Sequence, residues 1–437
     1  MTTEAAVAIV IFAFTFAGIL SGKVHRTVAA AIGAAIMVMV GIAMDFYTEE
    51  EALAAIDFNT IGLLMGMMIL VGLLEQTGFF QYMAITAGQL SRGSPWLLLV
   101  TLGTTTTVLS MFLDNVTTIV LIAPVTIRIA ETLGIKVVPL LMAEALLSNT
   151  GGVATLVGDP PNIIIASAAG FSFNDYLTHS LPVVLIVWPA ALLSLRIVFR
   201  RELAEKPRHI AALMEMRASD ALHDLVALRK TLIVFAVVIV MFFLHEQFHL
   251  SPAFVAMAGA SAGLLWVGIG VEHALERALE SVEWSVLLFF AALFVTVGGL
   301  EASGLLGDIG TQVGDLADQN LLMASLAMLW TASIASAIVD NIPFTIAMVP
   351  IIEQIGERGI GTSPLWWALV FGAGFGGNGT PIGSTANVVA VTMSERTDTP
   401  ITTLMWLRSG SVVMLVTTVL ATLAFIPLYE IGLLTTP

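Results

Sequence analysis

Two short stretches decide the fold: Leu113-Asp114-Asn115-Val116-Thr117-Thr118 and, in the second half of the chain, Val339-Asp340-Asn341-Ile342-Pro343-Phe344. Each places an aspartate beside an asparagine in the middle of a long apolar stretch. Aspartate and asparagine are preferred N-cap residues, so each pair is suited to begin a helix after a turn. An ionisable residue in a membrane segment also indicates function by default. Capping and ion binding are both open for these pairs, and one carboxylate can do both.

The composition around these stretches is that of a membrane protein. Of 437 residues, 57% are hydrophobic and only 11% are charged, and the mean hydropathy is +0.95, whereas soluble domains carry about a quarter charged residues. The net charge of -15 argues against nucleic acid as a partner. The absence of cysteine excludes disulfides and thiolate metal sites. The N-terminus, Met-Thr-Thr-Glu, has no basic region, which predicts a retained first span in the lipid bilayer.

The chain contains an internal repeat. The stretch from Gly72 to Gly78 matches the stretch from Gly298 to Gly304, and the two Asp-Asn pairs match at the same offset of 226 residues. After a one-residue deletion, residues 151–162 match residues 376–387. Duplicated halves are common in transporters. We expect a first repeat over 1–200, a cytoplasmic linker over 201–228, and a second repeat over 229–437.

Each half contains six apolar elements in the same order. They lie near 4–22, 27–43, 59–75, 96–127, 139–169 and 180–199, and near 229–246, 253–270, 284–301, 320–351, 364–393 and 406–428. If both fourth elements are hairpins and residues 196–230 are cytoplasmic, every Lys and Arg except Arg358 lies on the cytoplasmic side, as the positive-inside rule requires. We therefore expect an all-α polytopic protein of the cell (inner) membrane, with two inverted repeats, about ten spans, two re-entrant hairpins and both termini outside.

Two amphipathic segments, 78–91 and 304–318, follow the third span of each half. In the second, Leu305, Ile309, Val313 and Leu316 recur at helical spacing, with Asp308, Asp315 and Asp318 between them. Such a helix can lie flat at the membrane interface, and an ordinary loop helix is equally open.

The fifth element of each half breaks. The runs Ser148-Asn149-Thr150-Gly151-Gly152 and Gly158-Asp159-Pro160-Pro161-Asn162 interrupt an apolar stretch, and a continuous helix does not tolerate such glycines and prolines. Asp159 and Pro160 are typical of the N-cap and first residue of a restarted helix, and Ser384 takes the equivalent place in the second half. We expect two hairpin tips and two broken helices to meet near the bilayer midplane, where helix ends and polar side chains replace an ion's water.

The charged residues of this region are Asp114, Glu144, Asp159 and Asp340, and we expect no Lys or Arg there. Glu144 has no acidic counterpart, since Leu369 holds its place in the second half. Proton exchange and a polar cavity wall are both open for Glu144, and Asp114 and Asp340 are further candidates for proton coupling. The acidic bias favours a cation, a proton or a neutral oxyacid as the transported species, with H+ or Na+ as the coupling ion.

The sequence also contains His245-Glu246-Gln247-Phe248-His249, which fits the zinc motif H-E-x-x-H. A membrane metalloprotease is the least favoured alternative, because a catalytic zinc needs three protein ligands and no third one follows at a familiar spacing. We expect no catalytic residues, no metal and no bound cofactor. No phosphate-binding loop of the type G-x-x-x-x-G-K-[ST] occurs, so any ATP-driven step would need a separate ATPase partner.

Several of these motifs resemble a known family. Leu113-Asp114-Asn115, the run from Ser148 to Gly152, Gly158-Asp159-Pro160-Pro161-Asn162-Ile163 and Phe173-Asn174-Asp175 are similar to the ArsB/NhaD permeases of the ion transporter superfamily. The Gly-Asp-Pro-Pro-Asn form resembles the branch that contains the melanosomal P protein and arsenite-permease-like proteins. The resemblance implies an elevator-type homodimer, with a scaffold near 1–75 and 229–301 and a moving transport domain near 96–200 and 320–437.

By the same resemblance, Asn115, Asn149, Thr150, Asn341, Asn378, Thr380 and Asn387 would line the substrate and cation sites. The complete set of candidate binding residues, taken from the tips and the breaks, is Asp114, Asn115, Thr117, Ser148, Asn149, Thr150, Gly151, Asp159, Asn162, Asp340, Asn341, Asn378, Gly379, Thr380, Ser384 and Asn387. The expected function is export of a small inorganic species of the arsenite or antimonite type in exchange for protons. A Na+/H+ antiporter is the first alternative. Sodium-coupled carboxylate transport is next, although Asn378-Gly379-Thr380 departs from the Ser-Asn-Thr motif of that branch.

Overall fold

The computed structural model describes residues 2–21, 23–268 and 274–435, and within these ranges the regular structure is entirely helical. The first half contains α1 (Thr3–Leu20), α2 (Arg26–Ala43), α3 (Glu49–Ala54), α4 (Phe58–Glu75), α5 (Phe79–Leu90), α6 (Pro95–Ser110), α7 (Asn115–Leu133), α8 (Val138–Gly152), α9 (Pro160–Ala169), α10 (Phe173–Asp175), η1 (Tyr176–Ser180) and α11 (Leu181–Val198). The linker holds η2 (Glu202–Ala204), α12 (Ile210–Glu215) and η3 (Ala218–Ala221). The second half contains α13 (Leu225–Leu244), α14 (Pro252–Gly268), α15 (Ala274–Glu280), α16 (Trp284–Ala302), α17 (Leu305–Gln319), α18 (Leu321–Val339), α19 (Asn341–Glu357), α20 (Ser363–Gly376), η4 (Gly377–Gly379), α21 (Thr385–Ser394), α22 (Thr403–Glu430) and η5 (Leu433–Thr435).

The two halves repeat each other in their packing. Helix α6 packs on α8 as α18 packs on α20, and α1 packs on α2 as α13 packs on α14. Other contacts cross between the halves: α4 packs on α14 as α16 packs on α2, and α7 packs on α21 as α19 packs on α9. The halves are therefore interwoven around a shared centre.

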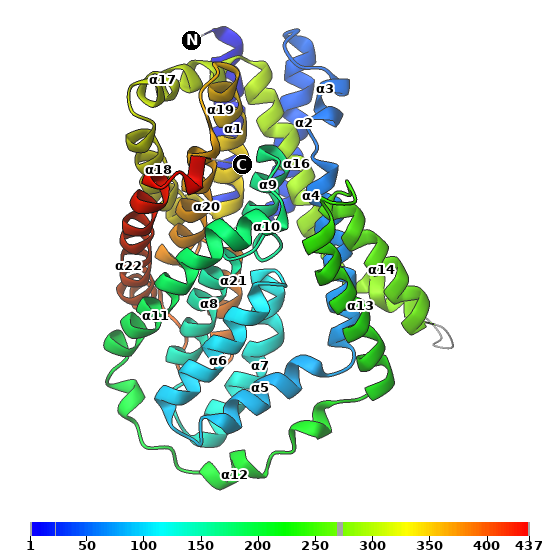
Figure 1. The fold of residues 1–437 in the computed structure, drawn as a ribbon, viewed down its shortest axis with the longest axis vertical. Coiled ribbons are helices and arrows are strands. Elements are labelled where there is room, and N and C mark those ends of the chain that lie inside the picture. Colours follow the sequence, from blue (N-terminus) through cyan, green and yellow to red (C-terminus); the bar gives the residue numbers. More distant parts are fainter. Residues whose placement is uncertain (1, 22, 269–273, 436–437) are drawn as a thin grey trace.

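The repeats are inverted, as the sequence predicts. In Figure 1, α5, α6 and α7 lie in the lower half of the molecule, whereas their counterparts α17, α18 and α19 lie in the upper half. The basic linker with α12 lies at the lower end, beside α5. Gln89 of α5 donates to the carbonyl oxygens of Leu213 and Met216, which holds the linker against that helix.

Both predicted hairpins are present. Helix α6 ends at Ser110 and α7 begins at Asn115, whereas α18 ends at Val339 and α19 begins only two residues later. Asp114 caps α7 by accepting a hydrogen bond of 2.9 Å from the backbone N–H of Thr117, and Asp340 caps α19 through Ile342 at 3.3 Å. Asp340 adopts a φ of +94°, a region in which residues other than glycine are strained. The second tip is thus the tighter of the two.

Both predicted helix breaks are present as well. The first separates α8 from α9 over residues 153–159, and the second separates α20 from α21 over 377–384, with η4 at its start. Every residue of α8 is buried, and so is every residue of α20 from Pro364 to Gly376. These two helices form the centre of the molecule, and their broken ends carry the polar residues.

By length and composition, eight helices of the described chain are long and apolar enough to cross a bilayer. The shorter apolar helices include α6, α14 and α21. Each of the ten predicted spans corresponds to one helix or to one broken pair: α1, α2, α4, α8 with α9, α11, α13, α14, α16, α20 with α21, and α22. The last two residues of the apolar element predicted at 253–270, residues 269 and 270, lie outside the described residues.

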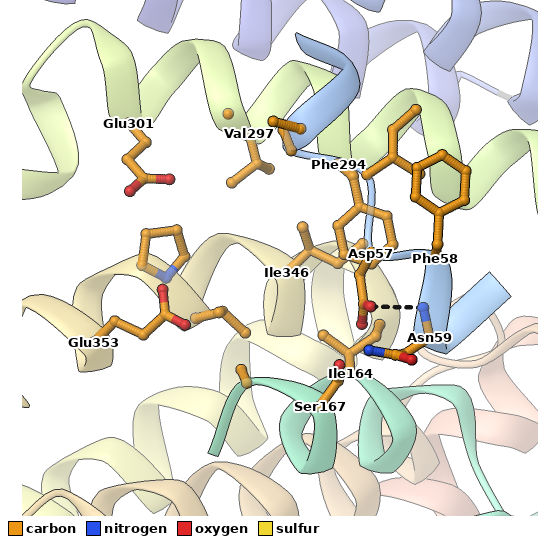
Figure 2. A pocket seen from close by; sticks show the side chains of 17 residues that line it. Asp57, Phe58, Asn59, Ile164, Ser167, Phe294, Val297, Glu301, Ile346 and Glu353 are labelled. Carbon is orange, nitrogen blue, oxygen red and sulfur yellow. Dashed lines mark hydrogen bonds between the residues drawn. The ribbon is translucent and has the colours of Figure 1, made fainter. Parts of the chain in front are cut away.

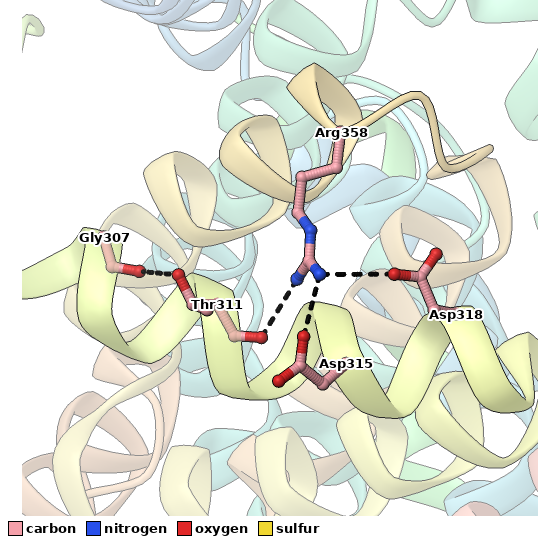
Figure 3. Close-up of polar contacts among 5 residues, drawn as sticks. All are labelled: Gly307, Thr311, Asp315, Asp318 and Arg358. Atoms are coloured by element: carbon pink, nitrogen blue, oxygen red, sulfur yellow. Dashed lines mark hydrogen bonds and ion pairs between the residues drawn. The ribbon is translucent and has the colours of Figure 1, made fainter.

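The two amphipathic segments form the helices α5 and α17, and each begins after a glycine in the left-handed region, Gly78 at φ +80° and Gly304 at φ +78°. Arg358, at the end of α19, holds α17 in place through Asp315 at 2.8 Å and Asp318 at 3.2 Å (Figure 3). The hydrogen bond to Asp315 raises the pKa of Arg358 above its ordinary value, so this arginine stays charged. The side chains of Asp308 and Ile309 lie outside the described residues.

Candidate functional site

The two tips and the two breaks converge on one central site. We define the central site as the tips 114–115 and 340–341, the breaks 153–159 and 377–384, and the polar residues of α8, α9 and α21 that contact them. At the first tip, Ser110 donates to the carbonyl oxygen of Ser148 on α8, with a distance of 3.0 Å. At the second tip, Asn341 donates to the Asp159 carboxylate at 3.1 Å. Each tip therefore contacts the first broken helix.

An asparagine in the first turn of each restarted helix stabilises the shape of the break. Asn162 donates to the carbonyl oxygens of Gly152 at 2.8 Å and Thr155 at 2.7 Å. Asn387 makes the equivalent bonds to Gly377 at 2.7 Å and to Thr380 at 2.9 Å. These carbonyls have lost their helical partners, and an unpaired buried carbonyl is costly. The amides of both asparagines therefore satisfy the breaks.

Four polar side chains from both halves form a buried network, which we name the amide cluster: Asn149, Asn378, Ser384 and Asn387. Asn149 donates to the side-chain oxygens of Asn378 at 3.0 Å and Asn387 at 2.9 Å. The Ser384 hydroxyl donates to the side-chain oxygen of Asn149 at 3.0 Å. The amide of Asn378 reaches the hydroxyl of Thr150 at 3.3 Å. The cluster joins the broken helix of one repeat to that of the other.

The first tip leaves one polar atom without a partner. The side-chain oxygen of Asn115 accepts from the hydroxyls of Ser110 and Ser148, while its amide nitrogen is buried with no hydrogen-bond partner among the described protein atoms. Because a buried unpaired donor costs free energy, this nitrogen is suited to donate to a solute oxygen.

Asp159 corrects one expectation from the sequence. It does stand at the N-cap position of α9, with Pro160 as the first helical residue, but its side chain makes no cap hydrogen bond. The carboxylate instead accepts from Asn341 of the other repeat and is 3% exposed. Ser384 behaves in the same way before α21, because its hydroxyl turns to Asn149. Both residues face across the molecule, and neither caps its helix by its side chain.

Arg26 corrects a second expectation, that no basic residue lies at this site. Its guanidinium donates to the hydroxyl of Thr385, the first residue of α21, at 2.5 Å. That hydroxyl in turn lies 3.5 Å from the Asp340 carboxylate. From the sequence, Arg26 is only one of the basic residues in the loop between two spans. The internal repeat gives no sign that it belongs to the site, since Pro252 takes the equivalent position.

Glu144 lies on α8, fully buried, five residues before Asn149. The hydroxyl of Thr126 donates to one of its oxygens, and the other oxygen has no partner among the described protein atoms. Five residues along a helix correspond to about 7.5 Å, so Glu144 stands behind the amide cluster and does not belong to it.

Four of the candidate residues contribute mainly to the backbone geometry. Thr117 bonds to the Asp114 carboxylate that caps its own helix, and Thr380 donates to the carbonyl oxygen of Ala337. A Cβ on Gly151 would lie 2.6 Å from the carbonyl oxygen of Thr107, and one on Gly379 would lie 2.5 Å from the sulfur of Met414. The two glycines permit close packing of the breaks.

The first histidine of the H-E-x-x-H motif makes hydrogen bonds to the backbone through both of its ring nitrogens. One ring nitrogen of His245 pairs with the carbonyl oxygen of Leu250 at 2.9 Å, and the other accepts from the backbone N–H of Phe173 at 3.4 Å. His249 lies in the loop at a φ of +54°. Within the described part of the chain, no three His, Asp or Glu side chains are grouped as metal ligands.

A cavity of about 570 Å³ lies beside the central site, between α4 and α16 on one side and α9 and α19 on the other. Figure 2 shows Glu301 and Glu353 at one end of it, and Asp57, Asn59 and Ser167 at the other. Ile164 of α9 and Ile346 of α19 line the cavity, and each follows the polar start of its helix by about one turn. The cavity thus approaches the central site from the upper half of the molecule.

Comparison with known proteins places the chain among transporters. A family model described as "Citrate transporter" (CitMHS) matches residues 16–372. The chain is 41% identical to the "46 kDa membrane protein" of Mycobacterium leprae, covering 95% of this chain and 96% of that protein. It is 40% identical to an "Uncharacterized transporter" of Mycobacterium tuberculosis, again over 95% of this chain and 96% of the relative.

More distant similarities extend this set. The chain is 34% identical to the human "P protein" over 90% of its own length, which corresponds to 56% of that protein. In overall fold it is similar to the YdaH transporter of Alcanivorax borkumensis, whose crystal structure is described as having "an unusual topology". The TM-score is 0.58 and the identity 16%, and the match covers 91% of this chain and 90% of the other.

Proposed function

The chain belongs to the citrate transporter family CitMHS, and we propose that it is an ion-coupled secondary active transporter whose central site binds a small solute together with a proton or a sodium ion. The observation that carries the proposal is the convergence of Asp159 and the Asp340 tip, from different repeats, beside the amide cluster. Carboxylate, amide and backbone oxygens are the ligands that replace water around a cation at broken helices.

We propose an elevator mechanism for movement of the site. The hairpins, broken helices and α11 with α22 would form the moving transport domain, approximately residues 96–200 and 320–437. The scaffold would be approximately 1–75 and 229–301. The cavity between α4 with α16 and α9 with α19 lies on the boundary between these two groups of helices, which supports a division at this surface. The arms α5 and α17 pack on the hairpins and would move with them.

As transported solute we propose a small neutral inorganic oxyacid of the arsenite or antimonite type, exported in exchange for protons. The amide cluster offers both donors and acceptors and no charge, and the buried amide nitrogen of Asn115, beside the Asp159 carboxylate, is a further donor for such an oxyacid. The carboxylates of Asp114, Asp159 and Asp340 would repel an anion unless a cation or Arg26 offset them. The proton would bind at Asp114, Asp340 or Glu144.

Two further substrates have specific support. Sodium itself, exchanged for protons, suits the same carboxylates and amide oxygens. A carboxylate is favoured by Arg26, which brings a guanidinium to the Thr385 hydroxyl, and by the description of the family as citrate transporters. Guanidinium pairs well with carboxylates, so this third candidate gains weight from the structure.

The deciding experiment is flux in proteoliposomes that contain the purified chain, with sodium, arsenite and citrate supplied in parallel and internal pH recorded. We expect arsenite movement that depends on a proton gradient and that falls at least about tenfold in Asp340→Asn, an effect of roughly 1.4 kcal/mol or more. Asp45→Asn, at an exposed aspartate after α2, is the matched control and should transport normally. If none of the three solutes moves under either direction of gradient, the proposal is wrong.

We further propose that the protein lies in the cell (inner) membrane with both termini outside, and that it is a homodimer. A separate ATPase partner would be needed for any ATP-driven export. The gathering of the basic linker and α12 at one end of the molecule (Figure 1) supports this orientation.

A further inference from the structure

Arg26 forms a bridge between two groups of helices that the proposed mechanism sets in relative motion. It is the first residue of α2, in the proposed scaffold, and its guanidinium lies 5.3 Å from the centre of the Phe289 ring of α16, also in the scaffold. Its Nη1 donates to the hydroxyl of Thr385 at 2.5 Å, at the start of α21 in the proposed transport domain. The guanidinium of Arg26 is thus held by a cation–π contact with Phe289 of the scaffold and donates a hydrogen bond to the transport domain.

The bridge ends on a carboxylate of the central site. The Thr385 hydroxyl accepts from Arg26 and lies 3.5 Å from Oδ2 of Asp340, to which it donates. The positive charge of Arg26 also acts on Asp340 directly through space. Three other carboxylates act on this region through space. Glu283, just before α16, interacts with Arg26 and with Asp114, and Asp159 interacts with Asp340 and with Asp114. Arg26 therefore joins the scaffold to the tip of the second hairpin.

The bridge occurs in only one of the two repeats. Pro252 takes the position of Arg26 and Pro160 that of Thr385 in the symmetry-related place, and neither side chain donates or accepts a hydrogen bond. The inverted fold forms without a bridge on that side, so the architecture itself does not require one. A charged, one-sided contact between the two helix groups is better explained by the transport cycle.

We propose that Arg26 is a latch that holds the transport domain against the scaffold while Asp340 is charged and releases it when a proton or sodium ion binds at Asp340. The inference rests on the proposed function and names the way in which cation binding controls it. With Asp340 ionised, the guanidinium attracts the tip and the Thr385 hydroxyl. A bound proton removes the negative charge of Asp340 and a bound sodium ion offsets it, so the guanidinium no longer faces a net negative charge across the hydroxyl. The transport domain therefore slides only when it is loaded, which is the condition for coupled exchange.

The first test is flux without a coupling cation. In the wild-type chain, solute movement should require a proton or sodium gradient. In Arg26→Gln the empty carrier is released, and we expect cation-independent movement of the transported solute to rise by about tenfold. Arg26→Lys keeps the charge but loses the planar fork and should show an intermediate leak. Arg92→Gln is the matched control, because Arg92 is an exposed arginine just after the C-terminal end of α5. A wild-type cation dependence in Arg26→Gln would overturn the proposal.

The second test measures position and does not depend on which solute is carried. The chain has no cysteine, so Asn59→Cys on α4 and Ser167→Cys on α9 can be cross-linked as a unique pair across the cavity that both residues line. In sodium-free buffer at high pH, the wild-type background should cross-link in high yield, and sodium or acid should lower the yield. Arg26→Gln should give the low yield under all conditions. Equal cross-linking yields in the wild-type and Arg26→Gln backgrounds would contradict the latch. So would a wild-type yield that does not change with sodium or pH. Absence of flux with normal cation-dependent cross-linking would count against the proposed function and leave the latch standing.

Discussion

Asn162 and Asn387 make the same pair of hydrogen bonds in the two halves of the chain. Each amide donates to a carbonyl where the preceding helix gives way to its break, Gly152 or Gly377, and to a second carbonyl inside the break, with all four distances between 2.7 and 2.9 Å. The two residues are fully or almost fully buried. The two breaks therefore share one hydrogen-bonding pattern. In each, a single asparagine amide replaces helical hydrogen bonds that are lost at the break.

Replacing either asparagine by alanine should therefore open its break. Two hydrogen bonds are lost and two buried carbonyls are left unpaired, so we expect each variant to lower the free energy of unfolding by about 2 to 4 kcal/mol. Transport should fall with it. Thermal unfolding in detergent measures the change, and Asn320→Ala, which removes an exposed N-cap asparagine of α18, should cost only about 1 kcal/mol. An Asn387→Ala variant as stable as Asn320→Ala would show that the break is held by other contacts.

Asp159 should matter for its charge more than for the start of α9. Its side chain does not cap the helix, and Asn341 donates to it from the other repeat. Asp159→Asn keeps the volume and removes the charge, so the fold should persist while cation-coupled flux falls at least about tenfold. Flux together with thermal unfolding separates the two effects. Ser172→Ala, which removes a true cap on α10, should show the opposite pattern, a loss of stability of about 1 kcal/mol with transport retained.

The sequence predicted the architecture because its signals are local and occur twice. The Asp-Asn pairs, the glycines and the Asp-Pro step mark chain turns whose position depends on neighbouring residues alone, and the repeat offset then relates the two halves. The tips at Asp114 and Asp340 and the breaks after Gly152 and Gly376 lie where these signals put them. Asp315 and Asp318 likewise belong to a helix, α17, that the spacing of the apolar residues between them and Leu305 predicts.

The sequence failed where a side chain leaves its own element. Asp159 stands at an N-cap position, and propensity cannot reveal that Asn341, 182 residues away, offers a better donor. Arg26 and Thr385 are separated by 359 residues, so the charge of this loop arginine alone predicts only that it lies on the cytoplasmic side. The amide cluster could be suspected from its residue types. The hydrogen bonds that Asn149 makes in this cluster depend on the packing of α8 against the second half of the chain, and no local sequence signal predicts them.

Glu144 offers a test of proton coupling. One of its buried oxygens accepts from Thr126 and the other has no partner among the described protein atoms, which makes it a candidate to carry a proton. Glu144→Gln keeps the hydrogen bond from Thr126 and cannot titrate. We expect flux driven by a proton gradient to fall about tenfold while binding of the solute is kept. Glu144→Leu, the residue type that Leu369 supplies in the other repeat, should stabilise the fold, because it removes a buried carboxyl group. Unchanged pH dependence in both variants would assign Glu144 a structural role.

The two glycines that begin the arm helices should differ sharply in their tolerance of alanine. Gly78 and Gly304 have the same left-handed backbone, so alanine costs each about 1 to 2 kcal/mol from conformation alone. A Cβ on Gly78 would also lie 1.7 Å from the carbonyl oxygen of Ala221 in the linker, whereas a Cβ on Gly304 meets nothing within 4 Å. Gly78→Ala should therefore be the more destabilising of the two in thermal unfolding and should release the linker to limited proteolysis. Equal losses of stability would mean that the linker shifts freely away from α5.

The inverted arrangement predicts that the two arms are reached from opposite sides of the membrane. Because the chain has no cysteine, a single cysteine can report on each surface with a membrane-impermeant maleimide applied to intact cells. Arg217→Cys in the linker and Arg92→Cys beside α5 should be protected until the cells are opened, since the basic end should face the cytoplasm. Asp315→Cys on α17 and Glu49→Cys on α3 should react at once. All four positions are exposed in the folded chain, so burial does not explain a protected residue. If Asp315→Cys and Arg217→Cys react from the same side, the arms do not lie on opposite surfaces, and the two tips cannot enter the membrane from opposite faces.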